Sequence, residues 1–346
     1  MSRYIIIIIS ISIVSVCFTE AADTPGKRPR PRDNVKVSPA NEMIIDGALK
    51  YLAGKQNPDG SWGVSSRERQ HPVAITGYTL MAFQAAGNLP NEGKYGKNVN
   101  DGMKYLLKGT QGYFGNPSSG QYMYGHGIAS IALGELYGKT RSKVIRGKLE
   151  NAIKLIIASQ NAQGGWRYRP VPRDADISVT VLQVVALRAA KNAGINVPKE
   201  TIDKAVGYVR ACYHPGTGGF GYQPGSGPGF ARTAAAIYSL QVCGQYDDKL
   251  VKEGSKYLIA NNRSSQQWYV YGTFYAAPAQ YMIGGKTWED WYKVAGGSAV
   301  KDSIKMENSM YRWDAKGGNG VGPIYTTAVY TTMLAMPYHY IPLYQR

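Results

Sequence analysis

Hydrophobic and polar positions along the chain form two kinds of segment that alternate. In residues 144–159 the pattern is amphipathic, since Ile153, Ile156 and Ile157 recur at helical spacing while Lys154 falls outside that stripe. In residues 177–194 nearly every position is apolar or small. A helix that is apolar on all sides must be buried, whereas an amphipathic helix can cover it and face water. The alternation therefore predicts buried helices, each paired with an outer helix.

Each kind of segment occurs six times. The amphipathic segments are 41–54, 98–108, 144–159, 200–211, 248–260 and about 287–300, and the apolar ones are 74–87, 124–138, 177–194, 230–244, 274–285 and 325–336. Glycines that follow the apolar segments are predicted C′ caps with positive φ: Gly87, Gly138, Gly194 and Gly244. Pro278 predicts a kink or a late start in the fifth apolar segment.

A recurring turn joins the two segments of each pair. It reads KQNPDGSWG at 55–63 and SQNAQGGWRY at 159–168, with weaker copies at 109–116, 214–222, 262–270 and 313–320. The turn aromatics lie about 50 residues apart, and the sixth copy, around Gly317 and Gly318, lacks one; they are Trp62, Phe114, Trp166, Phe220 and Trp268. A period near 50 suits a helical hairpin with its loops. We predict an all-α, (α/α)6 toroid of six helical hairpins over residues 40–346, the alternative being an open solenoid of helical pairs.

The N-terminus predicts export. Arg3 precedes an isoleucine-rich apolar run, and Thr19 and Ala21 are small residues at the −3 and −1 positions of a cleavage site. We expect a signal peptide at 1–21, with an uncleaved anchor as the alternative, followed by a basic Pro-rich linker at 22–39. The expected location is secreted, periplasmic or in the cell envelope.

Charge and cysteine content narrow the expected partners. The formal net charge of +17 favours an anionic polymer or a membrane surface, or else reflects a solvated basic face; no nucleic-acid motif is present, so nucleic acid is not expected. Cys212 and Cys243 lie in apolar helical contexts that favour buried free thiols over a disulfide. The four histidines fall in separate segments without metal-ligand spacing, so neither a metal nor a cofactor is expected.

The turn phrase resembles the QW-type repeat of squalene-hopene and oxidosqualene cyclases and the related turns of protein prenyltransferase β-subunits. Gln56 with Trp62 and Gln160 with Trp166 match it, and Phe114 is an aromatic substitute. The resemblance implies that the Gln bridges helix ends and that the Trp packs on the neighbouring hairpin. It also implies that functional groups surround one mouth of a central cavity, where the inner helices begin. The candidate cavity-binding residues are His126, Tyr124, Arg232, Tyr271 and Tyr325.

Residues 173–178, RDADIS, resemble the D-x-D-D-T/S motif of class II cyclases. Asp174 and Asp176 match, and the resemblance makes Asp176 the acid that protonates an alkene or epoxide, whereas Ile177 replaces the last aspartate. The alternatives are that the two carboxylates cap a helix N-terminus or form an ion-paired surface patch. The Asp-x-Cys zinc pair of prenyltransferases is missing, because neither Cys212 nor Cys243 has an Asp two residues before it.

Three functions remain open at this point. The first is a cyclase-like or prenyltransferase-like toroid whose cavity binds an isoprenoid, a lipid or another elongated ligand. The second is a non-catalytic binding or scaffold protein of the cell envelope, and the third is a glycan-active enzyme. The sequence has 27 Tyr and only 6 Phe, which favours a wetter cavity than a triterpene tunnel.

Overall fold

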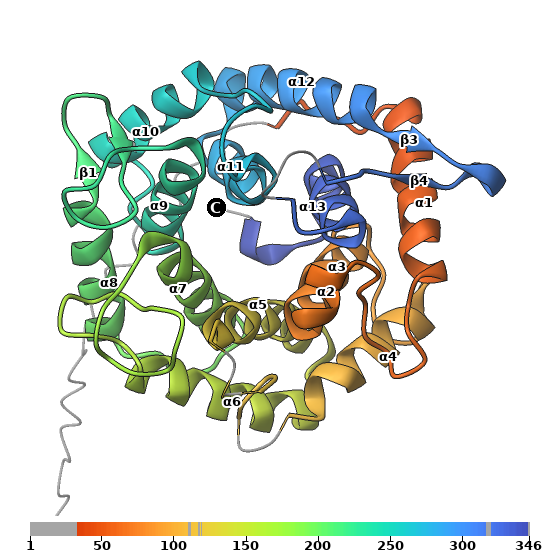
Figure 1. Cartoon of the computed structure of the whole chain (residues 1–346), viewed down its shortest axis with the longest axis horizontal. Helices are drawn as coiled ribbons and strands as arrows, with labels where there is room; N and C mark the ends of the chain where they lie inside the picture. Colours follow the sequence, from red (N-terminus) through yellow and green to blue (C-terminus); the bar gives the residue numbers. More distant parts are fainter. Residues whose placement is uncertain (1–32, 110–111, 117, 119, 316–319, 345–346) are drawn as a thin grey trace, which may run out of the picture. The chain divides into compact units, whose positions relative to one another are not determined.

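The computed structural model describes residues 33–109, 112–116, 118, 120–315 and 320–344. These residues form two concentric rings of helices (Figure 1), so the predicted all-α toroid is confirmed. The predicted signal peptide at 1–21 and most of the predicted linker at 22–39 lie outside the described residues. Within the described ranges, no helix is both long and apolar enough to cross a membrane.

The inner ring consists of the six apolar helices. They are α3 (Pro72–Ala85), α5 (Tyr122–Thr140), α7 (Ile177–Asn192), α9 (Phe230–Val242), α11 (Tyr269–Ile283) and α13 (Pro323–Leu334). Each of these helices packs on the next, and α13 packs on α3. The ring is therefore closed, and the alternative of an open solenoid is wrong.

The outer ring consists of the amphipathic helices. They are α1 (Pro39–Gly54), α4 (Gly96–Leu107), α6 (Lys143–Ala158), α8 (Lys199–Ala211), α10 (Lys249–Ala260) and α12 (Gly285–Asp302). The shorter elements are α2 (Ser66–Gln70), the antiparallel pair β1 (Tyr213–His214) and β2 (Gly219–Phe220), the antiparallel pair β3 (Ile304–Lys305) and β4 (Tyr311–Arg312), and the 3-10 turns η1 (Glu307–Ser309), η2 (Met336–Tyr338) and η3 (Pro342–Tyr344).

The turn tryptophan joins the two helices of its own hairpin. Trp166 is buried, and its Nε1 donates a hydrogen bond to the carbonyl oxygen of Ile156 at 2.7 Å, near the end of outer helix α6. Its backbone N–H donates to the hydroxyl of Thr180 on inner helix α7 at 3.1 Å. Trp62 and Trp313 make the same two bonds, with Leu52 and Thr76 and with Ala299 and Thr327. The repeat thus uses one side chain to satisfy a helix-end carbonyl and to fix the hairpin.

The turn glutamine bridges helix ends, as the resemblance implied, and in doing so joins neighbouring hairpins. Gln160 Nε2 donates to the carbonyl oxygens of Gly164 in its own turn and Thr201 in the next outer helix, both at 2.9 Å. Gln56 bonds Gly60 and Asn98 in the same way, both at 3.0 Å.

Three details of the predicted repeat are wrong. Trp268 is not a turn anchor: it is 45% exposed and sits just before α11, and Trp313 fills the buried position in the sixth hairpin. Helix α11 begins at Tyr269, earlier than predicted, and continues through Pro278. Gly138 lies inside α5, because Arg141 adopts the left-handed conformation that ends that helix. The other three predicted cap glycines do have positive φ.

A buried carboxylate helps to close the ring between the first and sixth hairpins. Glu68, on α2, accepts backbone hydrogen bonds from Ser65 through Oε2 and from Tyr325 through Oε1, each at 3.0 Å. Ser65 in turn donates to the carbonyl oxygen of Val321 at 3.1 Å. Cys212 is buried and Cys243 half-buried, and both are free thiols, as predicted.

Candidate functional site

A cavity of about 1130 Å³ opens at the end of the ring where the inner helices begin. Residues at or near the N-terminal ends of all the inner helices line it, among them His71, Tyr78, Tyr124, Ser178, Arg232, Tyr271 and Tyr325. The C-terminal segment lies at the opposite end, where Tyr340 and Tyr344 neighbour Ala85 and Ala335 at the ends of α3 and α13. The sequence-predicted residues Tyr124, Arg232, Tyr271 and Tyr325 therefore all line one cavity.

The ends of the inner helices contribute partial positive charge to this cavity. An α-helix carries partial positive charge at its N-terminus, and an acidic side chain in the first turn normally offsets it. Among the described residues, none of the inner helices has an acidic residue in its first turn. Two of them nevertheless have a carboxylate on a first-turn backbone N–H: Asp176 caps α7, and Glu68 of α2 accepts from Tyr325 of α13.

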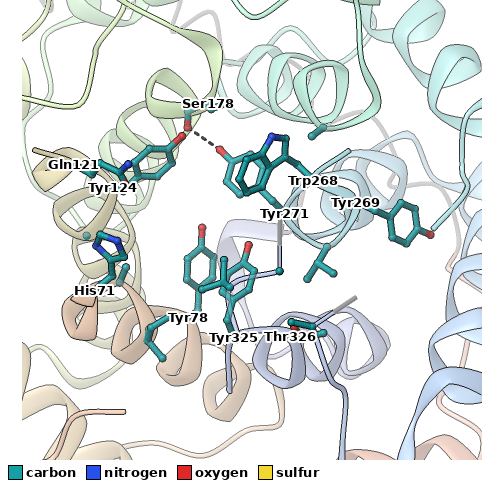
Figure 2. Close-up of a pocket in the computed structure, with 18 of the residues that line it drawn as sticks. His71, Tyr78, Gln121, Tyr124, Ser178, Trp268, Tyr269, Tyr271, Tyr325 and Thr326 are labelled. Carbon is teal, nitrogen blue, oxygen red and sulfur yellow. Dashed lines mark hydrogen bonds between the residues drawn. The ribbon is translucent and has the colours of Figure 1, made fainter. Parts of the chain in front are cut away.

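Tyrosine side chains form the floor of the cavity. Figure 2 shows the hydroxyls of Tyr78, Tyr124, Tyr271 and Tyr325 pointing toward a shared space. The rings of Tyr78 and Tyr325 meet edge to face at 4.9 Å, and the Tyr271 hydroxyl donates to the carbonyl oxygen of Ser178 at 2.7 Å. Burial raises the pKa of Tyr78 to about 12, and it also raises the pKa values of the other three well above the ordinary value. All four are therefore neutral near pH 7 and offer hydroxyls and aromatic faces.

Behind one wall, Arg167 lies against two cavity-lining tyrosines. Its guanidinium is 4.7 Å from the ring centre of Tyr168 and 5.5 Å from that of Tyr222, and the two tyrosine hydroxyls are hydrogen-bonded to each other. Arg167 Nε lies 3.5 Å from a carboxylate oxygen of both Asp174 and Asp176. The positive charge of Arg167 is thus offset by carboxylates away from the cavity.

Asp176 is an N-cap, as the alternative interpretation predicted. Its Oδ1 accepts backbone hydrogen bonds from Ser178 and Val179, both at 2.9 Å. Burial raises the pKa of this carboxyl to about 6, although these backbone bonds and the charge of Arg167 oppose the shift. Asp176 is not among the cavity-lining residues, and Asp174 is exposed. The catalytic role of the pair stays a prediction.

His126 does not line the cavity, contrary to its predicted place. It is fully buried: Nδ1 is 2.9 Å from the Tyr122 hydroxyl, Nε2 is 3.2 Å from the carbonyl oxygen of Ala152, and the ring stacks on Phe114. Burial lowers the pKa of His126 to about 4, so the ring is neutral near pH 7. The Tyr122 hydroxyl accepts the backbone N–H of Phe114 at 3.1 Å, as Thr180 does for Trp166, and His126 joins Tyr122 to outer helix α6.

Sequence reasoning missed the role of Trp268. This residue lines the cavity from the start of α11, in a left-handed conformation (φ 58°). The five other tryptophans of the sequence, all within the described ranges, are at most 2% exposed. One available signal was that NRSSQQW lacks the glycine that precedes the aromatic in the first four turns.

Acidic groups also reach the cavity. Asp302 and Asp314 line the side nearest α12 and β4, and Asp314 pairs with Arg312 at 3.1 Å. In the part of the chain that the structure describes, no group of three or more His, Cys, Asp or Glu side chains is placed to hold a metal ion.

Comparison with known proteins supports the fold. The chain matches no protein-family model and no curated protein sequence. It is similar to the structure of cellobiose 2-epimerase from Bacillus thermoamylovorans B4167, with a TM-score of 0.64, 13% identity, and coverage of 86% of this chain and 98% of that one. It is also similar to the structure of the GH76A alpha-1,6-mannanase from Salegentibacter sp. HEL1_6, with a TM-score of 0.63, 6% identity, and coverage of 87% of this chain and 99% of that one.

A type II terpene cyclase, MstE from Scytonema, is also similar, with a TM-score of 0.56, 14% identity, and coverage of 87% of this chain and 99% of that one. These structures are toroids of the same kind, which agrees with the fold inferred from the QW-type repeat. At such identities the likeness establishes the α/α toroid and leaves its chemistry to the residues of the cavity.

Proposed function

We propose that the cavity binds an elongated, hydroxyl-rich ligand, namely an oligosaccharide chain. The observation that carries this proposal is Trp268, a large aromatic side chain that lines the cavity and is 45% exposed. A left-handed backbone is strained for a bulky residue by roughly 1–3 kcal/mol, so an exposed Trp held in it suggests a functional constraint. A flat indole in a cavity that also presents hydroxyls and amides suits stacking against the apolar face of a sugar ring.

The rest of the lining supports the same ligand class. Besides the tyrosine hydroxyls, it contains neutral amides and hydroxyls such as Gln121, Gln266, Gln267 and Ser265. A sugar carries a hydroxyl on most of its carbons and requires donors and acceptors of this neutral kind. Aromatic faces combined with a few convergent polar groups are typical of small-molecule sites.

Binding without cleavage is the proposed activity. Of the two lining carboxylates, Asp314 is engaged by Arg312. Asp176, the buried acid whose pKa is raised, does not line the cavity, and its Oδ1 caps helix α7. Two carboxylates on opposite sides of the scissile bond are what glycoside hydrolysis normally requires.

An isoprenoid ligand is the second candidate. Tyr78 meets both Tyr325 and Phe274 edge to face, with ring centres 4.9 and 4.8 Å apart. Such faces would stabilise a carbocation by cation–π attraction, and Asp176 would then be the proton donor. In that case Asp176→Asn should abolish turnover of a polyprenyl substrate while leaving its binding intact.

Quenching of tryptophan fluorescence by acrylamide tests the first proposal. Because Trp268 is the exposed tryptophan, it should account for most of the quenchable emission. A panel of tetrasaccharides, including mannotetraose and cellotetraose, should contain at least one that protects this emission, and Trp268→Ala should weaken its binding about tenfold or more. The control is Tyr340→Ala, an exposed aromatic at the opposite end of the ring.

The contrary result is equally clear. If no tetrasaccharide binds by calorimetry and geranylgeraniol in detergent protects Trp268, the isoprenoid candidate replaces the glycan.

The predicted export would bring the cavity to cell-envelope or extracellular polymers. Sequencing the N-terminus of protein recovered from its own cells checks that part, with a mature chain beginning at Ala22 as the expected result.

A further inference from the structure

Arg232 occupies a fixed position in the cavity wall. It is the third residue of α9, and its Nη1 donates to the carbonyl oxygen of Gly227 at 2.8 Å. The guanidinium lies 6.0 Å from the ring centre of Tyr222, and its Cδ and Nε lie 3.5 Å from where a Cβ on Gly229 would be. The side chain is thus folded back over the start of its own helix, and a ligand would find it already oriented.

The charge of Arg232 has no carboxylate partner among the described residues. The neighbouring Arg167 forms ion pairs with Asp174 and Asp176, and Arg312 forms one with Asp314. One of the five guanidinium N–H groups is used by Gly227, so the others remain to bind a ligand. A half-buried cation that lines a cavity without a counter-ion favours a ligand that brings one.

The surroundings of Arg232 favour an anion as well. The start of α9, which has no side-chain cap and no acidic residue in its first turn, lines the same cavity with its partial positive charge. Asp302 and Asp314 lie near α12 and β4, in the sixth hairpin, whereas Arg232 belongs to the fourth. The cavity therefore has a cationic subsite at α9 and acidic residues in a different hairpin. An anionic group of a ligand is expected to bind at the α9 side.

We propose that Arg232 binds the carboxylate of a uronic acid residue, so that the cavity prefers acidic oligosaccharides over neutral ones. This inference rests on the proposed glycan binding and names the sugar class. A planar guanidinium matches a carboxylate in a two-bond arrangement, and the adjacent Tyr222 and Tyr168 hydroxyls can accept or donate to the sugar hydroxyls beside it.

Calorimetry with one glycan in two charge states tests the proposal. The probes are tetragalacturonate and its fully methyl-esterified form, which has the same chain without the charges. Wild-type protein should bind the acid about 10- to 100-fold more tightly than the ester at low salt, and the preference should shrink as sodium chloride is raised. Arg232→Gln should lose the preference, because its affinity for the acid should fall by more than its affinity for the ester.

Two further variants make the result specific. Arg169→Gln removes the same charge from an exposed residue outside the cavity lining and should keep the preference. Arg232→Lys should restore part of it, because a lysine supplies the charge without the planar two-bond geometry. Unchanged urea unfolding of Arg232→Gln shows that the variant is folded.

The outcomes separate the two proposals. Equal wild-type affinity for acid and ester overturns the role of Arg232 and leaves glycan binding standing. If tetragalacturonate, its ester and the neutral tetrasaccharides all fail to bind, the proposed function itself is wrong. Binding of farnesyl diphosphate that depends on Arg232, with no binding of tetragalacturonate, overturns the uronate assignment in favour of a phosphorylated isoprenoid.

Discussion

Glu135 is a carboxyl buried at the end of the ring opposite the cavity. It lies on α5, is 3% exposed, and accepts the backbone N–H of Leu343 through Oε2 at 3.4 Å. One turn further along, Lys139 donates to the carbonyl oxygen of Tyr340. Burial raises the pKa of Glu135 to about 7, against an ordinary value of 4.5, although the Leu343 bond and the charge of Lys139 oppose the shift. The C-terminal segment is thus packed on a group that resists ionisation.

This shift makes the stability of the protein depend on pH. Because the unfolded chain loses the proton first, the stabilising contribution is complete below about pH 4.5 and is lost as the pH rises to about 7. Each pH unit of difference between the two pKa values corresponds to about 1.4 kcal/mol, so the loss is about 3 kcal/mol. Glu135→Gln keeps the size of the side chain and an acceptor oxygen but carries no charge.

Urea unfolding at several pH values, followed by tryptophan fluorescence, measures the effect. We expect Glu135→Gln to match wild type within about 1 kcal/mol near pH 4.5 and to be more stable by about 3 kcal/mol at pH 8. Glu150→Gln, which alters an exposed carboxylate paired with Arg146, should show no such trend. If the difference between Glu135→Gln and wild type is the same at both pH values, the burial argument is refuted.

Three other substitutions test the architecture by urea unfolding near pH 7. Trp166→Phe should cost about 1–3 kcal/mol, because the carbonyl oxygen of Ile156 loses its buried donor, and a loss under about 0.5 kcal/mol would contradict the role given to the indole. Asp176→Ala should cost about 0.5–2 kcal/mol through the lost cap of α7, and an unchanged midpoint would show that the cap contributes nothing. Gly164→Ala should cost about 2 kcal/mol or more, or prevent folding, since φ is +94° and the added Cβ would lie 2.1 Å from the carbonyl oxygen of Lys204; wild-type stability would refute the close approach.

The architecture could be predicted from the sequence because two separate signals mark each hairpin. Apolar and amphipathic segments alternate with helical spacing, and the turn aromatic marks each hairpin, so the helix positions follow within a few residues. The misplaced fifth aromatic shows the limit of this signal. Trp268 has nearly the right spacing, but a periodic tryptophan can equally be a rim residue, and only packing distinguishes the two.

The cavity was partly predictable for the same reason. Residues at inner-helix starts, such as Tyr124 and Tyr325, face one space because six parallel helices bring their N-termini together. His126 also lies near the start of its inner helix, α5. Its side chain, however, is on the face of α5 that packs against Phe114, so it points into the wall. The contacts of Glu68 with Tyr325 join residues more than 250 positions apart, and no local pattern specifies such a pairing.

The contacts of Asp33 join the two ends of the described toroid, and they bear on where the chain could be opened. Asp33 accepts from Trp288 Nε1 at 3.1 Å, and its other carboxylate oxygen lies 3.5 Å from Nε2 of His339. The beginning and end of the ring are therefore neighbours in space. A short linker could join them and new termini could be opened in an exposed loop, such as the one at 262–267, without removing a hairpin. Such a circularly permuted chain would still form the ring, because a closed ring has no first repeat.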